Sequence, residues 1–209
     1  MSSQAARFAR PSRARVRRKR LTLLALAAVA GAVVAGVLGG TGPLEDAVRE
    51  ITLPLQHEDV IRQQASDKNI DAALIAAVIY EESRFHDQTS HAGARGLMQI
   101  TPDTAEFIAR RSGGVLFEQA DLATPQINIA YGAWYLRYLI DHYEGNETLA
   151  IAAYNAGLAN VDRWVEQAGS PEQFDSARHI PFPETRAYVE NVQERRGQYR
   201  DHYGEELGL

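Results

Sequence analysis

Two adjacent glutamates, Glu81 and Glu82, end an apolar segment and are well placed for proton-transfer chemistry. Val78 and Ile79 lie about one turn before Glu82 in the expected helix, so burial there would raise the pKa of a carboxyl. A carboxylic acid that keeps its proton near neutral pH can act as a general acid and protonate a leaving group. Helical spacing does not decide between the two glutamates, and no second carboxylate stands out as a nucleophile or base.

Four short segments stand in a fixed order along the chain. They are EESRF at 81–85, GARGLMQITP at 93–102, AYNAG at 153–157 and ETRAYV at 184–189. Together they resemble the catalytic domain of the soluble-type (SLT) lytic transglycosylases, bacterial enzymes that cut the glycan strands of peptidoglycan. The resemblance implies a mainly α fold, an α+β lysozyme-like domain with at most short strands, and cleavage of the MurNAc–GlcNAc β-1,4 bond.

The resemblance also implies a mechanism with one carboxylate. The family's catalytic glutamate immediately precedes a serine, which selects Glu82, followed by Ser83, over Glu81. This glutamate would act first as acid and then as base, with help from the substrate acetamido group, and would leave 1,6-anhydro-MurNAc ends. A hydrolytic muramidase on the same fold stays open, as does an inactive peptidoglycan-binding module.

Further residues of these segments are expected to bind the substrate. Tyr154 is the implied partner of the catalytic carboxyl and the acetamido group, and Ser90 is implied to orient that group, although Asp87 stands where the family commonly has proline. Met98 offers an adaptable apolar contact, with core packing as the alternative. Tyr188 is expected to pack. The substrate-binding set is Ser83, Ser90, Met98, Gln99, Tyr154, Asn155 and Glu184.

Sequence signals for helix starts indicate which elements carry these residues. Asp71 is a plausible N-cap for the helix that ends in the glutamates, and Thr-Pro pairs at 101–102 and 124–125 open two more helices. Any strand is expected to be short and to lie within 85–100. The helices are expected at about 57–68, from 71 onward, 101–111, 124–145, 147–154, 158–168 and 184–199.

Composition argues against metal-binding and nucleic-acid-binding proteins. The chain has no cysteine, and its six histidines show no zinc-type spacing, so no metal and no cofactor are expected. Eight basic residues and no acid lie within residues 1–20, while the net charge of the whole chain is −5. The rest of the chain is therefore strongly acidic, and a nucleic-acid partner is not expected.

The basic block directly precedes an uncharged segment, Leu21 to Leu38, of near-minimal membrane-spanning length. Under the positive-inside rule this predicts a single-pass bacterial cell-membrane protein with its catalytic domain outside the cytoplasm. A cleaved signal peptide and a secreted form are the alternative. The expected divisions are a cytoplasmic tail at 1–20, a transmembrane signal-anchor at 21–40, a linker at 41–54 and the catalytic domain at 55–205.

Overall fold

The computed structural model describes residues 42–113 and 117–209 and divides the chain into two compact units. Within the unit Met1–Thr52, the described part is mostly α2 (Pro43–Thr52), so the expected linker contains a helix with proline in its first turn. The predicted anchor at 21–40 lies outside the described residues. In the ranges that are described, no helix is long and apolar enough to cross a membrane.

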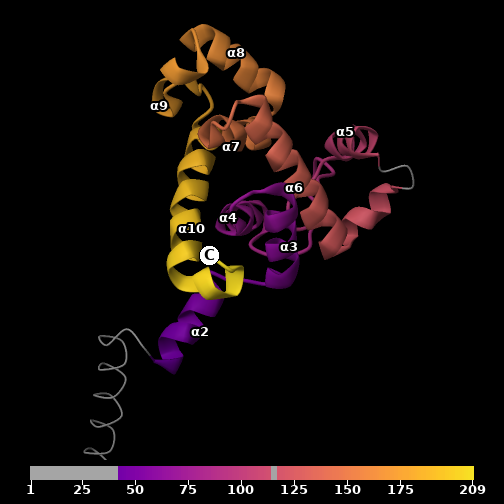
Figure 1. The fold of residues 1–209 in the computed structure, drawn as a ribbon, viewed down its shortest axis with the longest axis vertical. Helices are drawn as coiled ribbons and strands as arrows, with labels where there is room; N and C mark the ends of the chain where they lie inside the picture. Colours follow the sequence, from indigo (N-terminus) through magenta and orange to yellow (C-terminus); the bar gives the residue numbers. More distant parts are fainter. Residues whose placement is uncertain (1–41, 114–116) are drawn as a thin grey trace, which may run out of the picture. The chain divides into compact units, whose positions relative to one another are not determined.

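The unit Leu53–Leu209 is mainly helical, as predicted (Figure 1). Its extended contacts are the isolated bridges Thr89–Arg95 and Arg95–Ile100, inside the segment where a short strand was expected. The helices are α3 (Glu58–Lys68), α4 (Ala72–Ser83), α5 (Pro102–Ser112), α6 (Pro125–His142), α7 (Glu147–Ala156), α8 (Leu158–Ala168), α9 (Ser176–His179) and α10 (Pro183–Leu207), with 3-10 turns η1 (Gln119–Ala123) and η2 (Pro171–Gln173).

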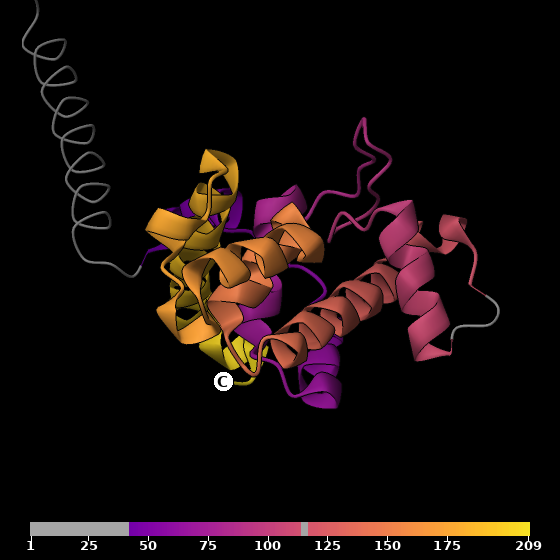
Figure 2. The ribbon, with the colours of Figure 1, turned by 90° about the horizontal axis from the view of Figure 1, so that it is seen from above.

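Helix α4, which carries both glutamates, is the core helix of this unit. Asp71 caps its first turn by accepting a hydrogen bond from the backbone N–H of Ala73 at 3.0 Å. Leu74, Ile75 and Ile79 are fully buried, and α3 and α10 pack against the helix (Figures 1 and 2). A helix that is apolar all round must be covered by its neighbours, so α4 holds its last turn in a fixed place.

Helix α10 is longer than the sequence predicted. It was expected to end near Tyr199 but continues to Leu207, with non-helical backbone at Tyr203. The hydroxyls of Tyr199 and Tyr203 donate to the carbonyl oxygens of Pro54 and Leu53, at 2.6 Å and 2.9 Å. These contacts fasten the end of α10 to the start of the unit, and local sequence signals do not report them.

The glycine-rich loop that follows α4 is anchored on Asn128 of α6. Asn128 is fully buried, accepts from the backbone N–H of Met98 at 2.8 Å, and donates to the carbonyl oxygens of Arg95 and Leu122 at 2.9 Å and 3.0 Å. Gly96 passes so close that an added Cβ would lie 2.1 Å from Asn128 Nδ2, and its φ is +75°. The loop therefore needs glycine at 96 and an amide at 128.

Substitution of Asn128 by alanine is expected to lower the free energy of unfolding by about 3 kcal/mol, because the buried backbone groups of the loop lose their partners. Urea denaturation of both proteins measures the difference. The matched control is Asn160→Ala, which removes a half-buried amide that donates to the carbonyl oxygen of Ala156 at 2.7 Å. The control is expected to cost about 1 kcal/mol or less. Equal losses in the two variants would contradict the anchoring role of Asn128.

Candidate active site

Three helices bring polar side chains together around the last turn of α4. A pocket opens there, and the catalytic candidate Glu82 lies in its wall beside Asn155 from the end of α7 and Glu184 from the start of α10. These three predicted site residues are far apart in sequence but share one cavity. The complete lining is Glu81, Glu82, Asn155, Glu184, Ala187, Tyr188 and Asn191.

The pKa of the Glu82 carboxyl lies near neutral pH. Burial raises its pKa to about 7, the hydrogen bond from Tyr188 opposes that rise, and the negative charge of Glu81 adds to it. The Tyr188 hydroxyl donates to Glu82 Oε1 at 2.6 Å. Glu82 therefore carries a proton below about pH 7 and is able to lose it slightly above, as a group that acts in turn as acid and base requires.

The carboxyl of Glu81 has partners on α10 that differ from those of Glu82. Glu81 Oε1 lies 3.5 Å from Arg195 Nε, and Glu81 Oε2 accepts from Asn191 Nδ2 at 3.3 Å. Both partners belong to α10. Glu81 therefore joins α4 to α10 through charge and hydrogen bonds, and of the two adjacent glutamates Glu82 has the environment of a proton donor.

The hydroxyls of the two tyrosines of the site have different hydrogen-bond partners from those that were expected. Tyr188, expected to pack, is the residue whose hydroxyl meets the Glu82 carboxyl. Tyr154, expected to partner that carboxyl, donates instead to the carbonyl oxygen of Met98 at 2.9 Å. Burial and the charge of Glu82 raise the pKa of Tyr154 well above its usual value, so its hydroxyl stays protonated near the site.

Four of the expected substrate-binding residues are not among those that line this pocket. Ser83 is buried, and its hydroxyl donates to the carbonyl oxygen of Leu97 at 2.7 Å. Met98 is fully buried, so the core alternative describes its side chain. Ser90 Oγ accepts from the backbone N–H of Ala94 at 3.1 Å. Gln99 Nε2 donates to the carbonyl oxygens of Gly96 and Gln88 at 2.8 Å and 3.1 Å.

These four residues therefore shape the glycine-rich loop. Polar groups of a tight loop must find hydrogen-bond partners, and here side chains of the loop itself provide many of them. The burial of Met98 has a steric basis as well. A Cβ on Gly132 of α6 would lie 2.3 Å from Met98 Sδ, so the missing side chain at 132 makes room for the methionine.

The site is built from carboxyl, hydroxyl and amide groups. Within 42–113 and 117–209, no three His, Asp or Glu side chains gather closely enough to hold a metal ion. The chemistry that this arrangement supports is proton transfer by Glu82, aided by the Tyr188 hydroxyl and bordered by amide and carboxylate groups able to bind a polar substrate.

Glu82→Gln is expected to raise the free energy of unfolding at pH 8 by up to about 3 kcal/mol. The pKa of Glu82 rises from 4.5 to about 7 on folding, so the folded protein binds more protons between these values and loses stability as pH increases. Glutamine avoids burying the ionised carboxylate. Urea denaturation at pH 4 and pH 8 measures the change, which is expected to be small at pH 4. A pH-independent difference would contradict the raised pKa.

Comparison with known proteins identifies the family of this chain. The profile of the Transglycosylase SLT domain family matches residues 59–176, and the chain belongs to this family. The chain is 34% identical over 177 residues to the soluble lytic murein transglycosylase of Salmonella typhimurium, covering 80% of this chain and 26% of the relative. It is 32% identical over 152 residues to the membrane-bound lytic murein transglycosylase F of Alcanivorax borkumensis, covering 67% and 30%.

Solved structures extend the likeness to the fold. The 70-kDa soluble lytic transglycosylase of Escherichia coli superposes with a TM-score of 0.68 at 33% identity, over 74% of this chain and 26% of that one. An inactive mutant of the lytic transglycosylase Slt from Pseudomonas aeruginosa gives a TM-score of 0.65 at 33% identity, over 73% and 25%. The chain thus spans about a quarter of the length of these relatives.

Proposed function

We propose that this protein is a peptidoglycan lytic transglycosylase that cleaves the MurNAc–GlcNAc β-1,4 bond and leaves 1,6-anhydro-MurNAc ends. The observation that carries the proposal is the carboxyl of Glu82, held in an open pocket with a pKa of about 7. Membership of the SLT family supports the assignment. The relatives named above are lytic transglycosylases by name, and the Pseudomonas aeruginosa protein is inactive as a Glu-to-Gln mutant.

In the proposed reaction, protonated Glu82 gives its proton to the glycosidic oxygen as the bond to C1 breaks. The acetamido oxygen of the same MurNAc attacks C1 and holds it as a cyclic cation. Glu82, now a carboxylate, accepts the proton of the 6-hydroxyl. The freed oxygen bonds to C1, and the acetamido oxygen leaves. No water is consumed, and the proton returns to Glu82, so one carboxylate serves both steps.

The neighbouring groups fit this cycle. The Tyr188 hydroxyl donates to Glu82 and stabilises the carboxylate that forms after the first step. Asn155 and Glu184 border the pocket and can bind sugar hydroxyl or acetamido groups. A second cavity, with Phe107, Tyr135 and Tyr138 in its wall, offers ring faces for further sugars, and the Tyr135 ring lies 5.7 Å from that of Tyr154.

Digestion of purified sacculi by residues 41–209, followed by mass spectrometry of the released muropeptides, tests the function. Anhydro ends are expected. Reducing ends would instead establish the hydrolytic muramidase, because water would have taken the place of the 6-hydroxyl. Binding of the protein to sacculi without release of fragments would establish the inactive binding module. The Glu82→Gln variant serves as the blank in all three comparisons.

We propose further that the uncharged segment at 21–40 anchors the protein in the cell membrane, with the catalytic domain at 55–205 outside the cytoplasm. The uncharged segment after eight basic residues supports this, and some relatives are named membrane-bound. The full chain is expected in the membrane fraction with its basic N-terminus retained, as N-terminal sequencing would show. A chain starting at residue 41 is the soluble control. A soluble mature form lacking residues 1–30 would establish the signal-peptide alternative.

A further inference from the structure

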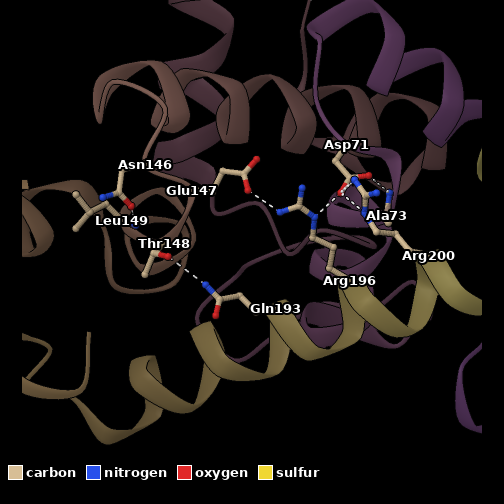
Figure 3. A network of polar contacts seen from close by, with 9 residues as sticks. All are labelled: Asp71, Ala73, Asn146, Glu147, Thr148, Leu149, Gln193, Arg196 and Arg200. Carbon is tan, nitrogen blue, oxygen red and sulfur yellow. Dashed lines mark hydrogen bonds and ion pairs between the residues drawn. The ribbon is translucent and has the colours of Figure 1, made fainter. Parts of the chain in front are cut away.

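One arginine joins the beginnings of the two helices that end in the site. Arg196 of α10 binds Asp71, the N-cap of α4, through Nε, and its Nη1 lies 2.5 Å from Oε2 of Glu147 in the first turn of α7 (Figure 3). A guanidinium can bind two carboxylates at once because its N–H donors point in different directions. Beside it, Gln193 of α10 donates to Thr148 of α7 at 3.1 Å.

The other ends of the same helices meet α10 in the site. Glu82, in the last turn of α4, accepts from Tyr188 at 2.6 Å, and Asn155, in the last turn of α7, accepts from Thr185 at 2.8 Å. Helix α10 therefore runs antiparallel to both α4 and α7. Arg196 binds both helices at one end. The hydrogen bonds of the site form at the other, where Glu81 also contacts Arg195 and Asn191 of α10.

Asp71 and Arg196 are both largely shielded from water. The side chain of Asp71 is 6% exposed and that of Arg196 is 25% exposed. Removal of an arginine that faces a buried carboxylate is costly, because the carboxylate loses its partner. Arg200, the next arginine along α10, also binds Asp71, with Nη2 at 2.9 Å, but its side chain is 50% exposed. In the described part of the chain, Arg196 links α10 to both helices, and Arg200 links it to α4.

We propose that Arg196 is a positioning residue that fixes how far α10 extends along α4 and α7, so that the hydroxyl of Tyr188 reaches the carboxyl of Glu82. The effect of Arg196 on catalysis rests on the proposed function, whereas its effect on the position of α10 does not. Hydrogen bonds weaken steeply with distance and angle, so a small slip of α10 is enough to lose the bond to Glu82. Arg196 thus acts on Glu82 from the far end of the helix.

A slip of α10 has a measurable electrostatic result. The groups that face Glu82 are Glu81 on its own helix, Tyr154 on α7, and Tyr188 and Glu184 on α10. Among these, Tyr188 is the donor that favours the ionised carboxyl. Loosening α10 removes this donor and raises the pKa of Glu82, so the pKa reports the position of the helix without any assay of activity.

The experiment follows the chemical shift of the Glu82 carboxyl carbon, Cδ, against pH by NMR in protein labelled with ¹³C-glutamate. The Glu82 signal is assigned by its absence from the spectrum of Glu82→Gln. Arg196→Met is expected to raise the pKa of Glu82 by about half a unit to one unit. Arg200→Met is the matched control, because it removes the same charge from Asp71 and leaves Arg196 in place. It is expected to leave the pKa unchanged. Glu147→Gln is a milder variant that weakens the α7 attachment and is expected to give a smaller shift in the same direction.

A double-mutant cycle separates position from charge. In the Tyr188→Phe background the donor is already absent, so Arg196→Met is expected to add no further shift. A shift that persists in this background would show that the charge of Arg196 acts directly on Glu82, and the proposal would be wrong. Loss of thermal stability with an unchanged pKa in Arg196→Met would equally overturn it. Inactivity of the wild-type protein on sacculi would refute the proposed function alone, since the titration does not depend on turnover.

Discussion

Replacement of Glu82 by glutamine is expected to reduce cleavage of purified sacculi on the order of 10²–10⁴-fold or more. The amide can neither give a proton to the glycosidic oxygen nor accept one from the 6-hydroxyl, so both steps of the proposed reaction fail. The fold is expected to survive, because the amide keeps the shape of the side chain and can accept the hydrogen bond from Tyr188. Release of soluble muropeptides per unit time measures the effect.

Glu81→Gln is the matched control, since it changes the neighbouring carboxyl in the same way. It is expected to keep most of the activity, because Glu81 is engaged with Arg195 and Asn191 of α10. Its negative charge contributes to the raised pKa of Glu82, so its removal is expected to move the alkaline limb of kcat/KM to lower pH. In the unmodified protein this limb is expected near pH 7, where free Glu82 loses its proton. A larger loss in Glu81→Gln than in Glu82→Gln would show that the acid is Glu81.

The sequence predicted the parts of the fold that depend on neighbouring residues. The caps Asp71 and Thr101 begin α4 and α5 as expected, because each accepts a hydrogen bond from a backbone N–H two or three residues ahead. The apolar run before Glu82 predicted burial of α4 and a raised pKa, and the structure has both. These inferences need only local chemistry and helical periodicity.

The contacts of Tyr188 could not be predicted in this way. Its hydroxyl meets Glu82 because α10 packs antiparallel to α4, and that packing depends on pairs such as Asp71 and Arg196, which are 125 positions apart. The available signal was the position of Tyr188, four residues after Glu184, which places both on one face of a helix. That spacing relates Tyr188 to Glu184 but does not identify the helix that faces them.

The glycine-rich loop shows a different limit of sequence reasoning. Ser83, Ser90 and Gln99 have side chains that bind sugars well, and the family resemblance implied that use. In the structure each one bonds to loop backbone, because a tight turn leaves N–H and C=O groups that need partners. The sequence did not predict these loop hydrogen bonds, and contact of the three side chains with a substrate stays a prediction.

Tyr154→Phe is expected to lower turnover about 10²–10³-fold, an effect as large as the loss of one oxyanion-hole hydrogen bond in other enzymes. The hydroxyl already donates to the carbonyl oxygen of Met98, so toward the substrate it is an acceptor. An acceptor there can bind the acetamido N–H and turn the acetamido oxygen toward C1. Phenylalanine keeps the ring and its packing, so the unfolding free energy is expected to fall by only about 1 kcal/mol.

Tyr188→Phe is the control variant, because it removes the other tyrosine hydroxyl of the site. Loss of the Tyr188 donor raises the pKa of Glu82, so that variant is expected to move the alkaline limb of kcat/KM to higher pH. Tyr154→Phe is expected to lower the rate across the whole pH range instead. On glycan strands whose N-acetyl groups have been removed, the unmodified protein and Tyr154→Phe are expected to be equally slow. A near-normal rate for Tyr154→Phe on intact sacculi would assign Tyr154 to packing and remove one support for the acetamido mechanism.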